Sequence, residues 1–203
     1  MAVSTMAASI ISGPPFLISI TGKTNTSIKG YAEACRAGTG GSYGLCYDAL
    51  DQPPKDSGPH QFWYEVSNGA NIKDDYLLYM LPINGSYSDG PFSAMQLRPA
   101  LGSNVNMAFI PLGIDRPTSF DVSDEDGKIY LADLEDDRNY SEKMPESRAR
   151  QDADNFHVCW QWVGPFWKYS VAWVTVLPPQ NPTCEPVELR LVGWGGQFGT
   201  RAA

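Results

Sequence analysis

The chain of 203 residues is poor in positive charge, in histidine and in long apolar runs. Its 15 lysines and arginines are outnumbered by 23 acidic residues, which gives a net charge of -8. A protein that binds a nucleic acid backbone needs a basic stripe, and the sequence has none, so we expect no nucleic acid partner. No apolar run reaches the roughly 18 residues of a membrane span, so we expect no membrane partner either.

Motifs of common catalytic sites are also missing. The chain has no dinucleotide fingerprint, and the glycine-rich loop predicted at 36–45 lacks the GK[ST] ending of a phosphate-binding loop. His60 and His157 are too far apart in sequence to form a zinc motif, and the acidic segment 115–137 lacks the spacing of a calcium loop. A glycosidase needs two facing carboxylates in a groove, and most acidic residues here fall in predicted loops, with Glu65 one of the exceptions in a strand. We therefore expect no metal and no cofactor.

What the chain does contain is a succession of short, alternating segments. Helical periodicity is almost absent, and 19 glycines and 16 prolines divide the sequence. We predict an all-β, single-domain antiparallel β-sandwich or barrel, jelly-roll-like or lipocalin-like, with an apolar pocket. This domain covers 13–194, between a flexible N-terminal arm, 1–12, and a flexible tail, 195–203. The predicted strands are 16–21, 28–35, 61–67, 76–83, 92–98, 105–110, 120–123, 128–131, 155–163, 167–176 and 187–192, and segment 135–154 is predicted to be a solvated loop or a short helix.

Cysteines and glycosylation motifs indicate the compartment. Four cysteines allow three connectivities, of which local pairing is the simplest: Cys35 with Cys46, and Cys159 with Cys184. Three N-x-[ST] motifs lie in turn-like stretches where a glycan would project outward. An even cysteine count together with these motifs predicts the secretory pathway or an extracellular location. The predicted glycosylation sites are Asn25, Asn84 and Asn139.

Segment 156–184 holds the densest group of aromatic residues. Its two predicted strands are apolar on both faces, so we expect both faces to be covered, one by the core and one by a ligand. A sparsely polar aromatic cavity is typical of a site for an apolar ligand, although each of these residues can equally belong to the core. The predicted lining residues are Trp63, Tyr79, Phe92, Met107, Trp160, Trp162, Trp167, Tyr169 and Trp173.

Three polar side chains of the same segment are candidate hydrogen-bond donors for catalysis. Lys168 lies between two aromatic residues, so its ammonium group either snorkels to the rim of the cavity or is a buried donor with an altered pKa. Gln161 and His157 share one strand face and are either satisfied structural groups or catalytic ones.

Several segments together resemble those of small secreted fungal β-glycoproteins with disulfides. They are AC-x-A-G before GLC (residues 34–46), Y-x-x-A-W (169–173), and P-x-N-P-T-C followed by V-x-L (179–189). This group includes the intermolecular hetero-Diels-Alderases of tropolone-sesquiterpenoid biosynthesis. The resemblance implies a cofactor-independent [4+2] addition of a tropolone o-quinone methide to a humulene-type alkene, with small lipophilic substrates as partners. Lys168, Gln161 or His157 would then polarise the quinone-methide carbonyl, and the tryptophans would stack on the tropolone ring.

A secreted lectin-like or effector glycoprotein without enzymatic activity is the alternative. Solvent exposure distinguishes the two functions. A flat exposed row of Trp160, Trp162 and Trp167 favours carbohydrate, whereas an enclosed cavity favours a lipophilic substrate. The sequence leaves the oligomeric state open.

Overall fold

The protein is all-β and antiparallel, as predicted from its sequence. The computed structural model describes residues 15–38, 41–55, 58–66, 75–82, 90–99, 102–112, 117–123, 125–132 and 154–193, and these contain strands and turns but no helix. The strands are β1 (Phe16–Gly22), β2 (Lys29–Arg36), β3 (Tyr43–Asp48), β4 (Phe62–Val66), β5 (Asp75–Met80), β6 (Phe92–Ala94), β7 (Gln96–Pro99), β8 (Val105–Ile110), β9 (Phe120–Val122), β10 (Ile129–Leu131), β11 (Phe156–Val163), β12 (Phe166–Val174) and β13 (Glu185–Gly193).

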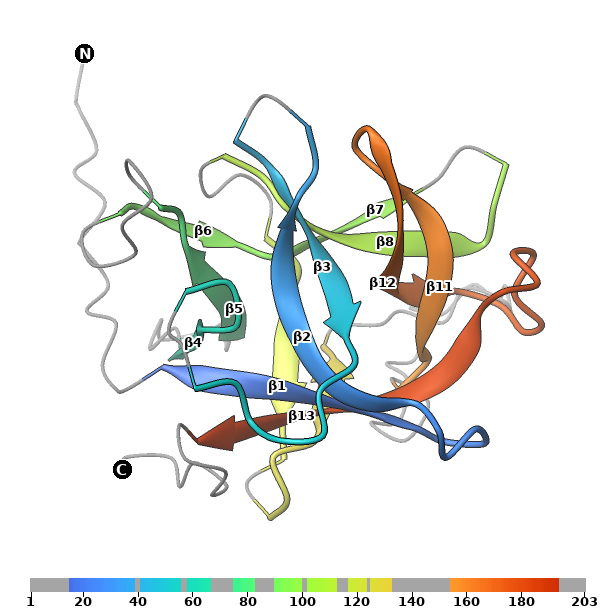
Figure 1. The fold of residues 1–203 in the computed structure, drawn as a ribbon, viewed down its shortest axis with the longest axis horizontal. Coiled ribbons are helices and arrows are strands. Elements are labelled where there is room, and N and C mark those ends of the chain that lie inside the picture. Colours follow the sequence, from blue (N-terminus) through green and yellow to red (C-terminus); the bar gives the residue numbers. More distant parts are fainter. Residues whose placement is uncertain are drawn as a thin grey trace, which may run out of the picture.

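Eleven of these strands form one sheet that closes on itself (Figure 1). The first strand, β1, pairs with the last strand, β13, from Phe16↔Gly193 to Gly22↔Val187. On its other side β1 pairs with β2, and the hydrogen-bonded order then continues through β3, β12 and β11 back to β13. Closure of this ring removes the free edges of its strands, which would otherwise expose unpaired backbone groups. The architecture is therefore barrel-like, and the strands β4, β5 and β6 extend it at one side.

The core fills the inside of this ring. Alternate residues of each strand point inward, and their apolar side chains are almost completely removed from water. The β9–β10 hairpin, which forms a separate two-stranded sheet, adds Phe120, Ile129 and Leu131 to the same core. Burial of each large apolar side chain contributes about 1.5 to 3 kcal/mol. Ring members of the core include Ile18, Ile20, Leu45, Phe156, Val171 and Leu189.

Strand β3 occupies part of the segment that the sequence predicts as a glycine-rich loop. Gly44 lies inside this strand, opposite Cys35 of β2. A Cβ atom placed on Gly44 would lie 2.6 Å from the Cγ1 of Val163, so only glycine allows β11 to approach so closely. The loop prediction was wrong for residues 43–45, because Gly44 is required for packing and does not mark a turn, whereas Ala37, Gly38, Gly41 and Ser42 lie outside the strands as predicted.

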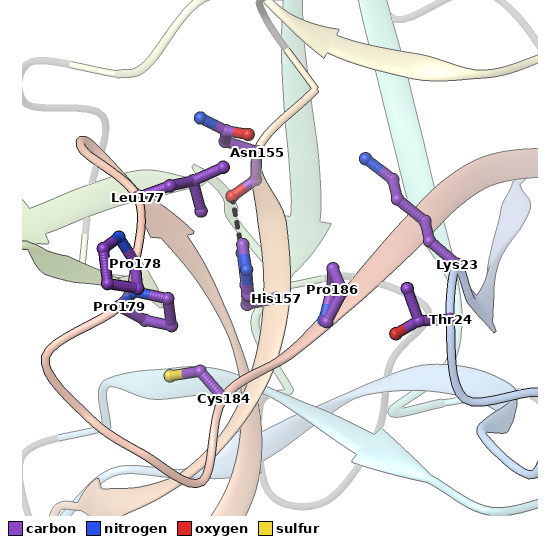
Figure 2. A pocket seen from close by; sticks show the side chains of 9 residues that line it. All are labelled: Lys23, Thr24, Asn155, His157, Leu177, Pro178, Pro179, Cys184 and Pro186. Carbon is purple, nitrogen blue, oxygen red and sulfur yellow. Dashed lines mark hydrogen bonds between the residues drawn. The ribbon is translucent and has the colours of Figure 1, made fainter.

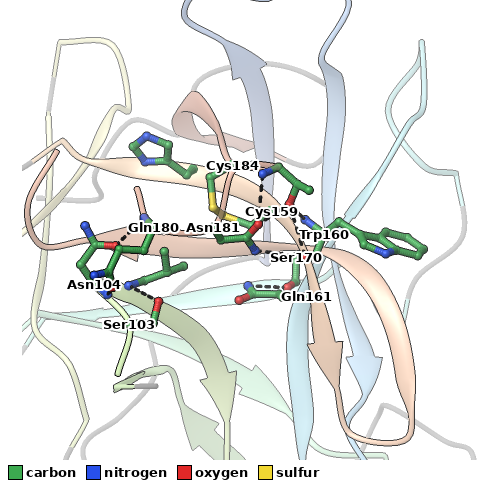
Figure 3. The surroundings of a disulfide bond; sticks show 12 residues. Ser103, Asn104, Cys159, Trp160, Gln161, Ser170, Gln180, Asn181 and Cys184 are labelled. Carbon is green, nitrogen blue, oxygen red and sulfur yellow. Dashed lines mark hydrogen bonds between the residues drawn. A yellow bond between two sulfur atoms is a disulfide. The ribbon is translucent and has the colours of Figure 1, made fainter. Parts of the chain in front are cut away.

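Both predicted disulfides are present. Cys35–Cys46 links β2 to β3, and Cys159–Cys184 links β11 to the segment before β13. Figure 3 shows that the second bond lies beside a network of polar contacts to the returning chain. Within this network Asn104 donates to the carbonyls of Val176 and Pro178, and its own carbonyl oxygen accepts from the backbone of Gln180.

The remaining predictions are not tested by the structure, in most cases because they concern segments that it does not describe. The arm 1–12, the end of the chain from 194, and the sites Asn84 and Asn139 lie outside the described residues. Asn25 is half-buried in its turn, and its Oδ1 accepts hydrogen bonds from the backbone and the hydroxyl of Ser27, so its glycosylation stays a prediction. Among the described residues no helix is long and apolar enough to span a bilayer. The two disulfides fit an extracellular or secretory protein.

Gly164 offers a test of the packing between the β11–β12 turn and the β2–β3 hairpin. Gly164 has φ +60°, and a Cβ there would lie 2.3 Å from the backbone carbon of Ala37. Gly102 has φ +74°, but a Cβ added to it would meet no atom within 4 Å. We expect Gly102→Ala to cost about 1 to 2 kcal/mol through backbone strain alone, and Gly164→Ala to cost about 3 kcal/mol or more because a clash is added. Urea denaturation measures both, and equal losses would contradict the packing described.

Candidate functional site

The predicted lining residues lie in different environments and do not surround one cavity. Tyr79 and Trp173 belong to the core. Trp63 and Phe92 form an edge-to-face pair between β4 and β6, with ring centroids 5.1 Å apart. Met107 packs against the Cys35–Cys46 disulfide. The remaining four, Trp160, Trp162, Trp167 and Tyr169, lie together on the outer half of the β11–β12 hairpin.

These four residues form what we call the aromatic face. They alternate along their strands, and Trp160 lies directly opposite Tyr169 while Trp162 lies opposite Trp167. Alternation places all four on the hairpin side that carries Phe156 and Trp173 farther along, where the same side packs into the core. At the outer half this side is open, and the side chains are between 41% (Trp160) and 56% (Trp162) exposed. The expectation that both faces of the hairpin are covered is therefore wrong for its outer half.

The rings of the aromatic face contact one another in a fixed pattern. The rings of Trp160 and Trp167 are nearly parallel, with centroids 6.4 Å apart and an interplanar angle of 14°. Tyr169 packs against Trp160 at 4.9 Å, and Trp162 meets Trp167 edge-on at 5.6 Å. Such mutual packing restricts the rotamers of each ring, so a ligand meets a surface that is already ordered.

The backbone beneath the aromatic face is held from two sides. On the opposite face of the hairpin, Val163 is fully buried against the Cys35–Cys46 disulfide. At the strand edge, the Trp160 N–H donates to the Thr183 hydroxyl, and the Asn181 amide donates to the Trp160 carbonyl. The aromatic face is therefore a rigid surface of the barrel, and this rigidity follows from contacts of the backbone and of the reverse face.

The three predicted catalytic residues lie on that reverse face. Gln161 donates to the hydroxyl of Ser170 at 2.7 Å. Lys168 is opposite Gln161 in register, its side chain is 39% exposed, and its ammonium lies 4.0 Å from Glu33. Lys168 therefore snorkels to the surface, which is one of the two alternatives that the sequence left open. His157 lies four residues before Gln161 along β11, about 13 Å away in an extended strand, so the three side chains do not converge.

His157 lines a separate pocket (Figure 2). This pocket has a volume of about 600 Å³, within the range of small-molecule sites. Its walls come from the turn after β1, the start of β11 and the proline-rich chain before β13, and they are largely apolar. The lining residues are Lys23, Thr24, Asn155, His157, Leu177, Pro178, Pro179, Cys184 and Pro186.

The protonation state of His157 follows from its surroundings. The residue is 4% exposed, and this burial lowers the pKa of its imidazole; Lys23 lowers it further, against the raising effects of the Asn155 carbonyl and of Glu185. The imidazole is therefore neutral at pH 7. Its Nδ1 lies 3.0 Å from the Asn155 carbonyl, which can only accept, so Nδ1 carries the proton and the lone pair of Nε2 is an acceptor.

Lys23, the other ionisable residue of the pocket, is engaged in an ion pair. Its ammonium lies 2.9 Å from the carboxylate of Asp154, which also binds Lys128 at 2.6 Å. Lys23, Asn155 and the proline wall were not identified from the sequence, because the pocket joins segments far apart in the chain. The closely spaced prolines 178, 179 and 182 were the one signal for a rigid wall, and the first two of them line the pocket.

Comparison with known proteins yields no match to this chain. No family model fits it, and neither a curated protein nor a solved structure is significantly similar. The resemblance to fungal hetero-Diels-Alderases stays a prediction from the sequence motifs, and the function is inferred from the sites themselves.

Burial of His157 predicts a pH dependence of stability. Because the folded-state pKa of this imidazole is lowered, the unfolded chain binds a proton that the folded chain does not, below about pH 6.5. We expect the free energy of unfolding to fall as the pH decreases through that window, with a slope of at most about 1.4 kcal/mol per pH unit from this group. His157→Gln should reduce the slope, as measured by urea denaturation between pH 7 and pH 5. An unchanged slope in the variant would contradict the buried neutral imidazole.

Proposed function

We propose that this protein binds carbohydrate through the aromatic face. One observation carries the proposal: four tryptophan and tyrosine rings, each more than two-fifths exposed, lie side by side on one rigid face of a β-hairpin. Removing such a surface from water is favourable, and exposed apolar patches of this kind mark interaction sites.

The composition of the aromatic face favours sugar rings as its ligand. The face contains no aliphatic side chain, and each of its rings combines a flat apolar surface with an N–H or O–H at its edge. A pyranose presents a complementary set of groups, since its C–H bonds form an apolar face and its hydroxyls lie at the periphery. Stacking therefore buries the apolar surfaces while the polar edges remain able to hydrogen-bond. The net charge of -8 favours neutral over anionic glycans.

Tryptophan substitutions test this function directly. Trp160→Ala and Trp167→Ala should each weaken binding to a neutral oligosaccharide by about tenfold or more, since loss of a buried aromatic contact typically costs more than 1 kcal/mol. Glycan-array screening of the wild-type protein identifies the oligosaccharide, and titration calorimetry measures the affinities. A parallel fluorescence titration should show enhanced protection of the indoles from a soluble quencher.

Leu112 provides the matched control. It is 60% exposed and is not part of the aromatic face, so Leu112→Ala removes an exposed apolar side chain without changing the proposed site. Its affinity should equal that of the wild-type protein. Absence of any glycan ligand, or equal losses in all three variants, would rule out a carbohydrate site on this face.

The His157 pocket supports a second candidate function, the hetero-Diels-Alder reaction that the sequence resemblance implies. The supporting observation is an apolar pocket of about 600 Å³ with one buried neutral imidazole in its wall. In this proposal Nε2 of His157 accepts the ring hydroxyl proton of a hydroxymethyl tropolone and passes it to the hydroxymethyl oxygen as the C–O bond breaks, so that the leaving group departs as water and the imidazole returns to its neutral form. The resulting o-quinone methide then forms one C–C and one C–O bond with an alkene of the humulene-type partner.

The pocket would contribute to this reaction mainly by holding two apolar reactants together. Orientation of this kind supplies several kcal/mol, up to about 7 to 11 in ideal cases. Gln161 and Lys168 do not line the pocket, so His157 is the one predicted catalytic residue with a role in it. The aromatic face likewise takes no part.

Filling the pocket tests the second candidate. Leu177 is 59% exposed at the pocket wall, and Leu177→Trp should occlude the pocket without disturbing the core. We expect the wild-type protein to raise the adduct yield or to change the adduct's stereochemistry relative to the spontaneous reaction. The variant should lose at least about nine-tenths of that effect, because losing the contacts of a substrate with its pocket typically costs about 1 to 3 kcal/mol. Leu112→Trp is the control, because it adds the same side chain elsewhere. Product analysis by chiral chromatography gives the answer, and a wild-type result identical to the spontaneous reaction excludes the pericyclase.

A further inference from the structure

A third group of polar side chains lies on the outer surface of the β2–β3 ribbon, away from both sites described above. It comprises Glu33 of β2, Asp48 at the end of β3 and His60 in the turn before β4. One ligand-type atom from each residue lies within 4.8 Å of the other two, and His60 Nε2 is 3.0 Å from Asp48 Oδ2. His60 is the most buried of the three, with 11% of its side chain exposed.

The local structure holds these three residues in place. Glu33 lies opposite Cys46, and Asp48 lies opposite Tyr31, so both carboxylates share one face of paired strands. The Cys35–Cys46 disulfide crosses the same two strands on that face, next to both carboxylates. The two strands therefore cannot separate at the point where the acidic side chains are attached.

The turn that carries His60 is fixed separately. Its Pro59 carbonyl accepts from the backbone N–H of Ala34 at 2.7 Å, and the Gly58 carbonyl accepts from Gln61 at 3.1 Å. The first bond attaches the turn to β2 at the residue directly after Glu33. The histidine is consequently positioned against the two carboxylates by the backbone as well as by its contact with Asp48.

From this arrangement we propose that Glu33, Asp48 and His60 bind a first-row divalent metal ion, with Zn²⁺ as the reference ion. One imidazole nitrogen and two carboxylate oxygens are a donor set that suits Zn²⁺ and departs from the all-oxygen preference of Ca²⁺ and Mg²⁺. Ligands at the usual 2.0 to 2.2 Å from zinc lie roughly 3.3 Å from one another, which the His60–Asp48 pair already matches. Glu33 is 28% exposed and its ligand atom lies within 4.8 Å of the other two, so the proposal requires a change of its rotamer to bring it to the same distance.

Three protein ligands leave a fourth position of tetrahedral zinc open. Sites with this composition hold a water molecule there and lower its pKa, whereas purely structural sites are closed by four protein ligands. The site therefore has the ligand count of a hydrolytic centre. It lies on the β2–β3 ribbon, near Lys168 on the face of the β11–β12 hairpin opposite to the aromatic face, and it does not depend on the carbohydrate proposal.

Lys168 gives the proposal a specific signature. Its ammonium lies 4.0 Å from Glu33, so in the metal-free protein it partly neutralises one of the three ligands. A divalent cation that binds Glu33 must either displace this ammonium or bind against its electrostatic repulsion. Lys168 is thus a competitor of the metal, and its removal should strengthen binding, whereas removal of a ligand should weaken it.

The test uses untagged, chelator-treated full-length protein and Zn²⁺ alone as the probe. Competition with a chromogenic chelator should give one Zn²⁺ per chain, and Co²⁺ substitution should give the visible absorption of a tetrahedral site. We expect His60→Ala and Asp48→Asn to weaken Zn²⁺ binding more than about 100-fold, since even the partners of metal ligands matter 10- to 100-fold. Lys168→Met should tighten it by about 3- to 10-fold, because a nearby positive charge is removed from a partly exposed site.

His157→Ala is the control, since it removes the only other histidine of the chain and leaves the three ligands unchanged. Its Zn²⁺ affinity should equal that of the wild-type protein. Circular dichroism before titration confirms that each variant is folded, and Glu33→Gln replaces any ligand variant that is not. Binding that survives His60→Ala, or that weakens on Lys168→Met, would overturn the proposal.

Discussion

The close packing of the β11–β12 hairpin on the β2–β3 ribbon determines where every candidate site lies. Val163 rests on Gly44, where no larger residue fits, and the Gly164 turn lies against the backbone of Ala37. This contact covers one face of the outer hairpin and leaves the other face to solvent. It also brings Lys168 to Glu33. A two-stranded ribbon is marginal on its own, so the aromatic rings keep their arrangement because the reverse face is buried and the strand edge is hydrogen-bonded to Asn181 and Thr183.

The two faces of that hairpin have different chemistry for one structural reason. Successive side chains of a strand point to opposite sides, so the eight residues of β11 alternate between the side that carries the aromatic face and the reverse side. The face with Trp160 and Trp162 is apolar and exposed, a costly combination that a bound ligand would relieve. The face with Gln161 and Val163 is packed or hydrogen-bonded. The proposed binding surface and the stabilising contacts therefore lie on opposite faces of one ribbon.

The sequence predicted the local features of the fold well. Alternation located most strands, and the spacing of the cysteines indicated both disulfides. Prediction from the sequence failed where a residue is required by a partner far away in the chain. Gly44 has the sequence context of a loop glycine, and only its packing against Val163 shows why glycine is needed there. Prediction failed again for the sites, because exposure of Trp160 and assembly of the Glu33, Asp48 and His60 group depend on which strands become neighbours. An aromatic strand residue has the same signature whether it faces a core or water.

The pairing of β1 with β13 has a consequence for how the chain folds. These strands are separated by almost the whole described sequence, so the ring cannot close until β13 has been synthesised. Contacts between such distant segments carry a large loop-closure entropy and slow the search for the native state. Until β13 has been synthesised, β1 remains unpaired on its β13 side. The Cys35–Cys46 disulfide can form during this interval, because its cysteines lie only 11 residues apart near the start of the sheet. Closure of the ring is thus the late step of folding, and it depends on the nine residues of β13.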